Sequence, residues 1–260
     1  MTQVTRRQVL GTLGVAVGTG LVGSVVARGG LASTGAGKQG GVPWPYHKLD
    51  PDAVAERGYR GYYKGHCMYG AFEAVVGELA DRYGAPYSTF PFDLMRYGAG
   101  GVAGWATLCG ALNGAAAAIY LLSPDPKPVM NELFSWYANA ALPDYRPKNP
   151  KFEIVKSVSG SPLCHVSVTN WCKESGHPSF SKQRSERCAW ITADVARYTA
   201  ELLNRQADGT FAVVHPIPKE VQTCRGCHDK GGEVENTRGK MNCTQCHDDV
   251  MKEHPVPIKG

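Results

Sequence analysis

The chain has 260 residues, 43% of them hydrophobic and 20% charged, which is typical of a folded globular protein and excludes a disordered polar chain. Its formal net charge is +5, but residues 1–32 contain three arginines and no acidic residue, so the rest of the chain is close to +2. A charge this small does not indicate nucleic acid as a partner.

The first 32 residues resemble a twin-arginine export signal, because Arg6 and Arg7 precede a weakly apolar run over 11–27. Signals of this kind are associated with proteins exported already folded. The run falls short of the roughly 20 strongly apolar residues that a membrane span needs. We therefore expect cleavage near Ala32, a periplasmic location and no stable membrane span afterwards, with residues 33–42 as a flexible linker.

Residues 43–215 are expected to form a mainly helical domain. Prolines hold its first residues in an extended conformation. The apolar periodicity predicts helices over 52–64, 67–83, 104–122 and 128–141, and a fifth that starts around Cys188 and includes 194–204. Two runs rich in β-formers, 151–158 and 211–214, look like short strands.

Residues 216–260 form a different kind of segment, with too few apolar residues to build a core of their own. The segment contains two Cys-x-x-Cys-His sequences, at 224–228 and 243–247. This is the c-type haem attachment signature, in which two thiols form thioether bonds to the haem and the histidine ligates its iron. Paired Cys-x-x-Cys units also bind zinc, but an all-thiolate zinc site needs no following histidine.

Two haem c groups are therefore expected in each chain. The covalent attachment residues are Cys224, Cys227, Cys243 and Cys246, and the proximal iron ligands are His228 and His247. The haems themselves would supply the apolar mass that the segment lacks, so we expect little regular structure in it. Only fourteen residues separate the two motifs, which favours neighbouring haems.

Five cysteines remain once the haem motifs are assigned: Cys67, Cys109, Cys164, Cys172 and Cys188. An odd number cannot be fully paired in disulfides. Thiols gathered from several elements suit an iron–sulfur cluster, which takes four cysteine ligands in its common forms. Disulfides in an oxidising compartment are the alternative, and the sequence leaves open which four of the five would bind a cluster.

Several segments of the sequence resemble those of a known protein family. Trp44-Pro45-Tyr46, the segments 66–70, 104–114 and 164–168, and the terminal haem pair resemble the split-Soret cytochromes c of sulfate-reducing bacteria. The body also resembles a wider group with a Cys, Gly-Cys-Ala-x-x-Gly, Cys, Cys signature. That signature is met by Cys67, by Cys109 with Ala111 and Gly114, by Cys164 or Cys172, and by Cys188, with an offset of one residue at Gly110.

The resemblance implies a homodimer with two haems in each chain, bis-histidine iron ligation and a [2Fe-2S] cluster. A distal histidine could then come from the partner subunit. Six histidines remain for the distal positions. Among them we take His47, His66 and His165 as candidates, ahead of His177, His215 and His254.

The expected function is electron transfer with periplasmic redox proteins, because two haem motifs are present and no catalytic set is recognisable. The protein would then be a redox carrier rather than an enzyme. Two other functions remain open at this stage. One is an oxidoreductase that reduces a small oxyanion or disulfide at an open haem site. The other is a redox sensor that works through reversible thiol chemistry.

Overall fold

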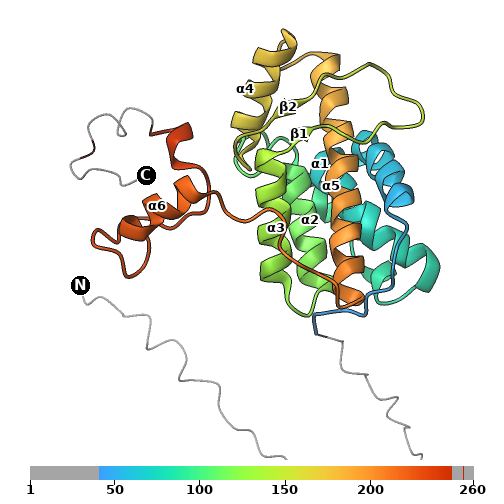
Figure 1. The fold of residues 1–260 in the computed structure, drawn as a ribbon. Helices are drawn as coiled ribbons and strands as arrows, with labels where there is room; N and C mark the ends of the chain where they lie inside the picture. The colour runs from blue at the N-terminus through green and yellow to red at the C-terminus, as the bar shows by residue number, and fades with distance from the viewer. Residues whose placement is uncertain (1–40, 248–253, 255–260) are drawn as a thin grey trace, which may run out of the picture. The chain divides into compact units, whose positions relative to one another are not determined.

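A computed structural model describes residues 41–247 and residue 254 (Figure 1). The expected export signal and nearly all of the expected linker lie outside the described residues. Within the part of the chain that is described, no helix combines the length and apolar character that a bilayer span requires. The main body is built of helices, as expected, with a single two-stranded sheet.

Helix α1 (Pro51–Tyr83) is two helices joined by a sharp reversal. It begins at the N-cap Asp50, whose carboxylate accepts the backbone N–H groups of Asp52 and Ala53. The backbone leaves helical geometry at Gly65 and at His66, which has φ 66°. Arg57 pairs with Asp81 at 2.5 Å, although these residues would be about 36 Å apart in one straight helix. The helices predicted over 52–64 and 67–83 are thus confirmed as two antiparallel halves.

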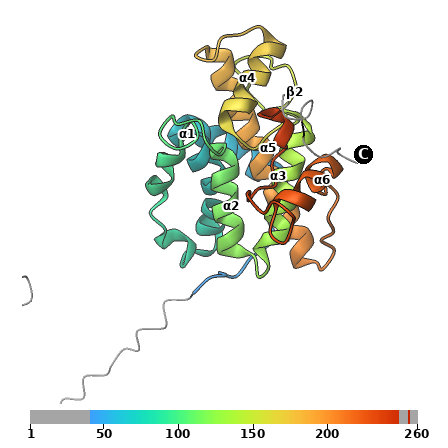
Figure 2. The same cartoon turned by 90° about the vertical axis from the view of Figure 1, so that its left-hand side faces the viewer.

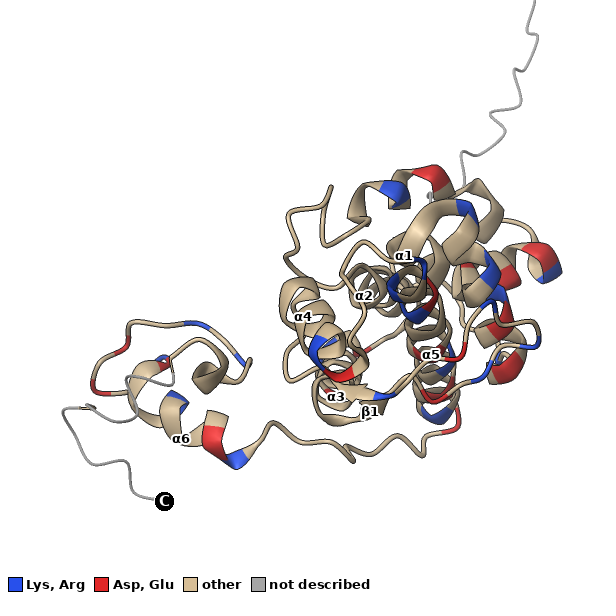
Figure 3. Ribbon diagram, turned by 90° about the horizontal axis from the view of Figure 1, so that it is seen from above, with Lys and Arg blue, Asp and Glu red and all other residues tan. Residues whose placement is uncertain are grey.

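The halves of α1 pack against α2 (Gly110–Leu122) and α5 (Lys182–Ala207), and α3 (Pro126–Asn139) packs against α2 and α5. These helices lie side by side in two perpendicular views (Figures 1 and 2). Their buried faces form the core, which includes Phe72, Leu112 and Val195. Short 3₁₀ helices at Tyr87–Thr89 and Phe92–Gly98 follow α1. Lysine and arginine are interspersed with acidic residues along the ribbon of the body (Figure 3).

The helix predicted over 104–122 is wrong in its first six residues. Residues 99–107 form an irregular loop in which Gly101 has φ 69°, and an added Cβ there would lie 2.7 Å from the Thr107 nitrogen. Such a conformation is accessible to glycine and interrupts a helix. The helix predicted over 128–141 is confirmed with shifted ends, since it starts at Pro126 and stops at Asn139.

Helix α4 (Cys164–Ser175) was not predicted, because its polar sequence reads as a loop. It lies at one end of the bundle (Figures 1 and 2). Helix α5 starts at Lys182, six residues before the predicted Cys188, because the Ser181 hydroxyl accepts the Arg184 N–H at 3.0 Å. The run 151–158 contributes only β2 (Ser157–Val158), which pairs antiparallel with β1 (Ala141–Leu142).

The run 211–214 is not a strand. The Val214 N–H bonds the Glu132 carboxylate at 2.9 Å instead of a neighbouring strand. Beyond it, the haem-motif segment has little regular structure, as expected, apart from α6 (Lys219–His228) and a 3₁₀ turn at Cys243–Gln245. Among its described residues only Val221 is buried, at 1% exposure, which agrees with a segment that has no core of its own.

Candidate metal and haem sites

Four of the five remaining cysteines come from four different segments of the body. Cys67 opens the second half of α1, Cys109 is the N-cap of α2, Cys164 opens α4 and Cys188 lies in α5. Backbone pairing brings two of these segments together, because the Cys109 N–H bonds the Pro162 carbonyl at 2.8 Å and the Cys164 N–H bonds the Thr107 carbonyl at 2.7 Å. The segments that carry Cys109 and Cys164 therefore lie side by side.

Electrostatic interactions link the four thiols. Burial raises the pKa of Cys67 to about 12, and Cys109, Cys188 and Cys164 add to this rise. Burial also raises the pKa of Cys164 to about 12, with further contributions from Cys109 and Cys188. The Cys67 and Cys164 thiols stay protonated at neutral pH unless a cationic centre takes the place of the protons.

The donor set fits an iron–sulfur centre. All nine cysteines are free thiols in this structure. Within the described residues no three Cys, His, Asp or Glu side chains are grouped as ligands of a single metal ion. A multi-iron cluster is larger than one ion and holds its cysteine ligands further apart, so four thiols from four segments without a one-ion grouping are compatible with a cluster and do not match a zinc site.

Positive charge lies near Cys109, Cys164 and Cys188. Cys109 and Cys164 lie at helix N-termini, where the backbone N–H groups favour negative charge. On α5, Arg184 and Arg187 act electrostatically on Cys188 and Cys164. Arg187 is almost completely buried, at 1% exposure. The surroundings thus favour an anionic group such as a thiolate-ligated cluster.

Gly110 explains why a glycine follows Cys109 in this sequence. A Cβ added at Gly110 would overlap the sulfur of Cys67 and would lie 2.6 Å from the backbone oxygen of Gly98. Only glycine permits so close an approach of α1 to the start of α2. Gly110, the residue that shifts the Gly-Cys-Ala-x-x-Gly signature by one position, is therefore part of the thiol site.

Cys172 is not brought into this group. It lies eight residues after Cys164 on α4, or about 12 Å further along the helix axis. Among the described residues, none of the electrostatic interactions that link the other four thiols includes it. Sequence reasoning could not separate Cys172 from the rest, because α4 itself was not predicted.

The first haem motif lies on α6. Its Cys224, Cys227 and His228 are spaced i, i+3 and i+4, so they share one face of the helix. The second motif starts in the 3₁₀ turn, and the Cys243 thiol interacts with that of Cys224, so one thiol of each motif meets the other. His228 is oriented by Asn236, whose Oδ1 lies 2.9 Å from its Nδ1.

The three distal candidates chosen from the sequence have other surroundings. His47 stacks on Tyr83 at 4.0 Å, and the exposed His66 meets the Tyr62 ring edge-on at 6.0 Å. His165 is exposed near the start of α4. In the described part of the chain, no hydrogen bond or ring contact links any of the three to residues 216–247.

His215 is better oriented to ligate a metal than the three histidines chosen from the sequence. Its Nδ1 lies 2.6 Å from the carboxylate of Glu132, which is fully buried and also accepts the Tyr198 hydroxyl at 2.8 Å. A carboxylate on one ring nitrogen is the usual arrangement for a metal-ligating histidine, because it orients the ring and leaves the other nitrogen available. The partners are 83 residues apart, so no local signal could reveal the pair. His254 also lies near a motif, 6.0 Å from the His228 ring.

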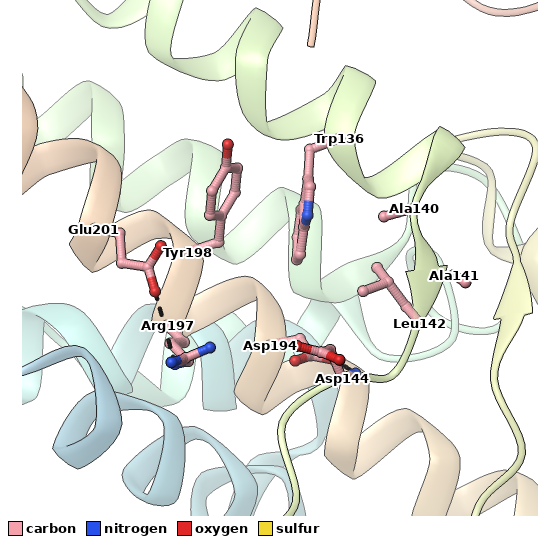
Figure 4. A pocket seen from close by; sticks show the side chains of 9 residues that line it. All are labelled: Trp136, Ala140, Ala141, Leu142, Asp144, Asp194, Arg197, Tyr198 and Glu201. Carbon is pink, nitrogen blue, oxygen red and sulfur yellow. Dashed lines mark hydrogen bonds and ion pairs between the residues drawn. The ribbon is translucent and has the colours of Figure 1, made fainter. Parts of the chain in front are cut away.

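A shallow pocket of about 250 Å³ lies elsewhere, between α3 and α5 (Figure 4). Trp136 and Tyr198 form one side of it, and Asp194, Arg197 and Glu201 contribute charged groups. Burial raises the pKa of Asp194 to about 7. No cysteine or histidine lines this pocket, so it is separate from both the thiol group and the haem motifs.

Comparisons with known proteins show which family this chain resembles. A family described as "Putative redox-active protein (C_GCAxxG_C_C)" matches residues 69–202. The split-Soret cytochrome c of Desulfovibrio desulfuricans is 41% identical over 93% of this chain and 93% of its own length. A solved structure described as "A novel iron centre in the split-Soret cytochrome c from Desulfovibrio desulfuricans ATCC 27774" superposes with a TM-score of 0.75 at 43% identity, covering 78% of this chain and 90% of that one. The chain therefore belongs to the split-Soret cytochrome c family, and its body belongs to the C_GCAxxG_C_C family.

Proposed function

We propose that this protein is a periplasmic electron carrier with two haem c groups in each chain and an iron–sulfur centre of the [2Fe-2S] type, and that it works as a homodimer. The observation that carries the proposal is the meeting of four thiols from four segments, with Cys109 buried and the other three partly buried, in a chain that also holds two complete haem motifs. The similarity to a cytochrome c, and to a solved structure described as containing a novel iron centre, supports it.

The bound haems and the cluster would supply one-electron chemistry, and the residues of the chain hold and tune them. Cys67, Cys109, Cys164 and Cys188 would hold the cluster. The two motifs would fix the haems covalently and bring their attachment points together, since Cys224 interacts with Cys243. Because basic and acidic residues are interspersed along the body (Figure 3), the choice of redox partner would depend on local contacts.

For a distal iron ligand we propose His215, because Glu132 already holds its Nδ1 and leaves Nε2 available. His215 lies in the segment that leads directly into α6, so the same buried carboxylate orients the imidazole and anchors the start of the haem-motif segment. The twin-arginine signature supports the periplasmic location, since a body with its thiol site assembled is suited to export in the folded state.

The test is an element count on the native protein with matched cysteine variants. We expect two haems in each chain by pyridine haemochrome, with additional iron and inorganic sulfide. Cys109→Ser should lose the non-haem iron and keep both haems, whereas Cys172→Ser should keep all of the iron. Native protein with no iron beyond its haems would overturn the cluster assignment. Equal losses of non-haem iron in Cys109→Ser and Cys172→Ser would overturn the choice of cluster ligands.

The oxidoreductase alternative is tested by ligand vacancy. If both irons carry two histidines, carbon monoxide and nitrite leave the low-spin spectra of the native protein unchanged. His215→Ala should then convert one haem to a high-spin, carbon monoxide-binding form, whereas His177→Ala, a control in the loop after α4, should not. A native haem that binds nitrite directly would favour the enzyme.

A further inference from the structure

Arg187 is a buried cation for which the structure provides no carboxylate. Its side chain lies on α5, and the residue is only 1% exposed. Its Nη2 donates to the Ser167 hydroxyl at 2.8 Å, and its Nε has no hydrogen-bond partner among the described residues. No ion pair to an acidic side chain is formed by Arg187 within residues 41–247. An unpaired buried charge of this kind is unusual and costly.

Arg57 shows what an ordinary partly buried arginine looks like in the same bundle. Its guanidinium contacts Glu73 at 2.7 Å, Glu78 at 3.3 Å and Asp81 at 2.5 Å. Arg57 is also more exposed than Arg187, with 19% of its side chain accessible. The more deeply buried of the two arginines is therefore the one without acidic partners, and its counter-charge has to come from another type of group.

Tyr137, Cys188, Cys109 and Cys164 interact electrostatically with Arg187. Three of these four residues are cysteines of the four-thiol site. Neutral thiols are weak partners for a guanidinium, but metal-bound thiolates carry negative charge. An iron–sulfur centre on these cysteines would therefore provide the charge that Arg187 lacks.

A single buried hydroxyl holds this arrangement in place. Ser167 is 1% exposed and accepts the Arg187 N–H. Its oxygen also lies 2.8 Å from the Tyr137 hydroxyl, and Tyr137 in turn interacts with Cys109. Ser159 completes the network at 2.9 Å from Ser167. The guanidinium and the phenol next to the thiols are thus oriented through one residue of α4.

We propose that Arg187 is the built-in counter-charge of the cysteine site, a positioning residue that retains the anionic iron–sulfur centre and raises its reduction potential. The inference rests on the iron–sulfur centre of the proposed function. Reduction adds one electron to the centre, with no bond made or broken and no proton moved. A fixed cation at low local dielectric stabilises the more negative reduced form more than the oxidised form.

The test compares Arg187→Met, Arg187→Lys and Ser167→Ala in the full haem-loaded protein. Methionine fills much of the volume and removes the charge, and lysine restores the charge without the planar fork. The matched control is Arg205→Gln, which lies on the same helix and pairs with Glu201 instead of the thiols. The readouts are non-haem iron and sulfide per haem, and a redox titration of the cluster by electron paramagnetic resonance, with the haems of the same sample as an internal reference.

We expect Arg187→Met to retain its haems and to show a ratio of reduced to oxidised cluster at least tenfold lower at fixed ambient potential, which is about 59 mV for a one-electron couple. Loss of more than half of the non-haem iron, with the haems retained, would support the proposal equally. Lysine should restore the iron content and part of the potential, and Ser167→Ala should shift the potential in the same direction by less.

A full complement of iron with an unchanged cluster potential in Arg187→Met would overturn the proposal. If Arg187→Met does not fold, Ser167→Ala and Arg187→Lys decide. Unchanged cluster potentials in both would overturn it, and downward shifts in both would support it. Wild-type protein without non-haem iron would instead contradict the proposed function itself, so the two failures can be told apart.

Discussion

The four body cysteines and the four haem-motif cysteines differ in what surrounds them. Cys109 is 7% exposed, and helices α1, α2, α4 and α5 bring the body thiols together. In the other region Cys227 and Cys246 are exposed, and Val221 is the one buried residue among positions 216–247. Packing of the protein builds the first site, whereas the second has attachment points in place but little protein around them.

For the proposed cofactors, this difference predicts an order of assembly. A site made by core packing is complete once the body folds, and a cofactor can be inserted there early. A site that lacks its own apolar surroundings takes them from the cofactor when the cofactor is attached. The two regions meet at Glu132, which holds the backbone of Val214 and His215 just before the haem-motif segment. Substitutions in each region should therefore have different consequences.

The largest effect is expected for Gly110→Ala. The added methyl group would meet Cys67 and the Gly98 carbonyl oxygen. Forced overpacking of this kind costs about 2–3 kcal/mol. We expect that loss in the free energy of unfolding, measured by urea denaturation, and loss of the non-haem iron. A variant with native stability and a full iron content would show that the site tolerates a wider spacing.

Glu132→Gln should have the next largest effect, about 2 kcal/mol, because several donors lose a buried charged acceptor. Burial alone would raise the pKa of Glu132, but the backbone and ring of His215, with Tyr198 and Val214, lower it. The folded-state pKa is therefore below the unfolded value of about 4.3. The contribution of the ionised Glu132 carboxylate to the free energy of unfolding is fully present above the unfolded-state pKa. It disappears as the pH falls through the folded-state pKa.

The measurement is urea unfolding of wild type and Glu132→Gln at pH 7 and pH 3. The difference between the two proteins should be largest at pH 7 and smaller at pH 3. Glu153→Gln removes an acid from an exposed ion pair with Arg146 and should leave stability unchanged at both values. A difference that grows towards acid pH would contradict the assignment of the charged carboxylate at Glu132.

Gly226→Ala is the counterpart of Gly110→Ala in the haem-motif segment. No atom lies within 4 Å of the added Cβ, and the residue is in α6. Replacement of a glycine inside a helix by alanine gains about 0.5–1 kcal/mol. Amide hydrogen exchange across 219–228 should slow roughly two- to fivefold, with haem content unchanged. Faster exchange would mean that α6 is constrained by contacts other than its own backbone.

The smallest effect on the body is expected when the haem attachment cysteines are all replaced by alanine. Since the described part of residues 216–247 buries little, the unfolding free energy of the body should change by under about 1 kcal/mol. Limited trypsin digestion should cut after Lys219, Arg225 or Lys230 and leave residues 43–215 intact. Destabilisation of the body comparable to that of Gly110→Ala would show that the haems also support the helical core.

Much of the fold could be predicted locally. Apolar periodicity located both halves of α1 and most of α2 and α3, because those helices bury one face each. It failed at 104–109, where glycine backbone conformations override a small-residue pattern, and at α4, whose polar face carries no periodic signal. The start of α5 was missed because a single cap, Ser181, extends the helix by six residues.

The haem motifs were the easiest part of the site to recognise, because attachment to one haem requires two thiols and a histidine within five consecutive residues. The thiol group could be proposed only as a set of five. The choice of four among them depends on which segments α4 and α2 bring together, and that is a long-range property.

The sequence by itself determined the chemistry of this protein: two haem attachment motifs, five further thiols and a mainly helical body. These follow from residue types at short spacing. Only the tertiary structure decided which thiols share a site, that Arg187 lies beside them without a carboxylate, and that Glu132 holds His215. Each of these depends on segments far apart in the chain, and the packing of the helices, not any local pattern, places their side chains within reach of one another.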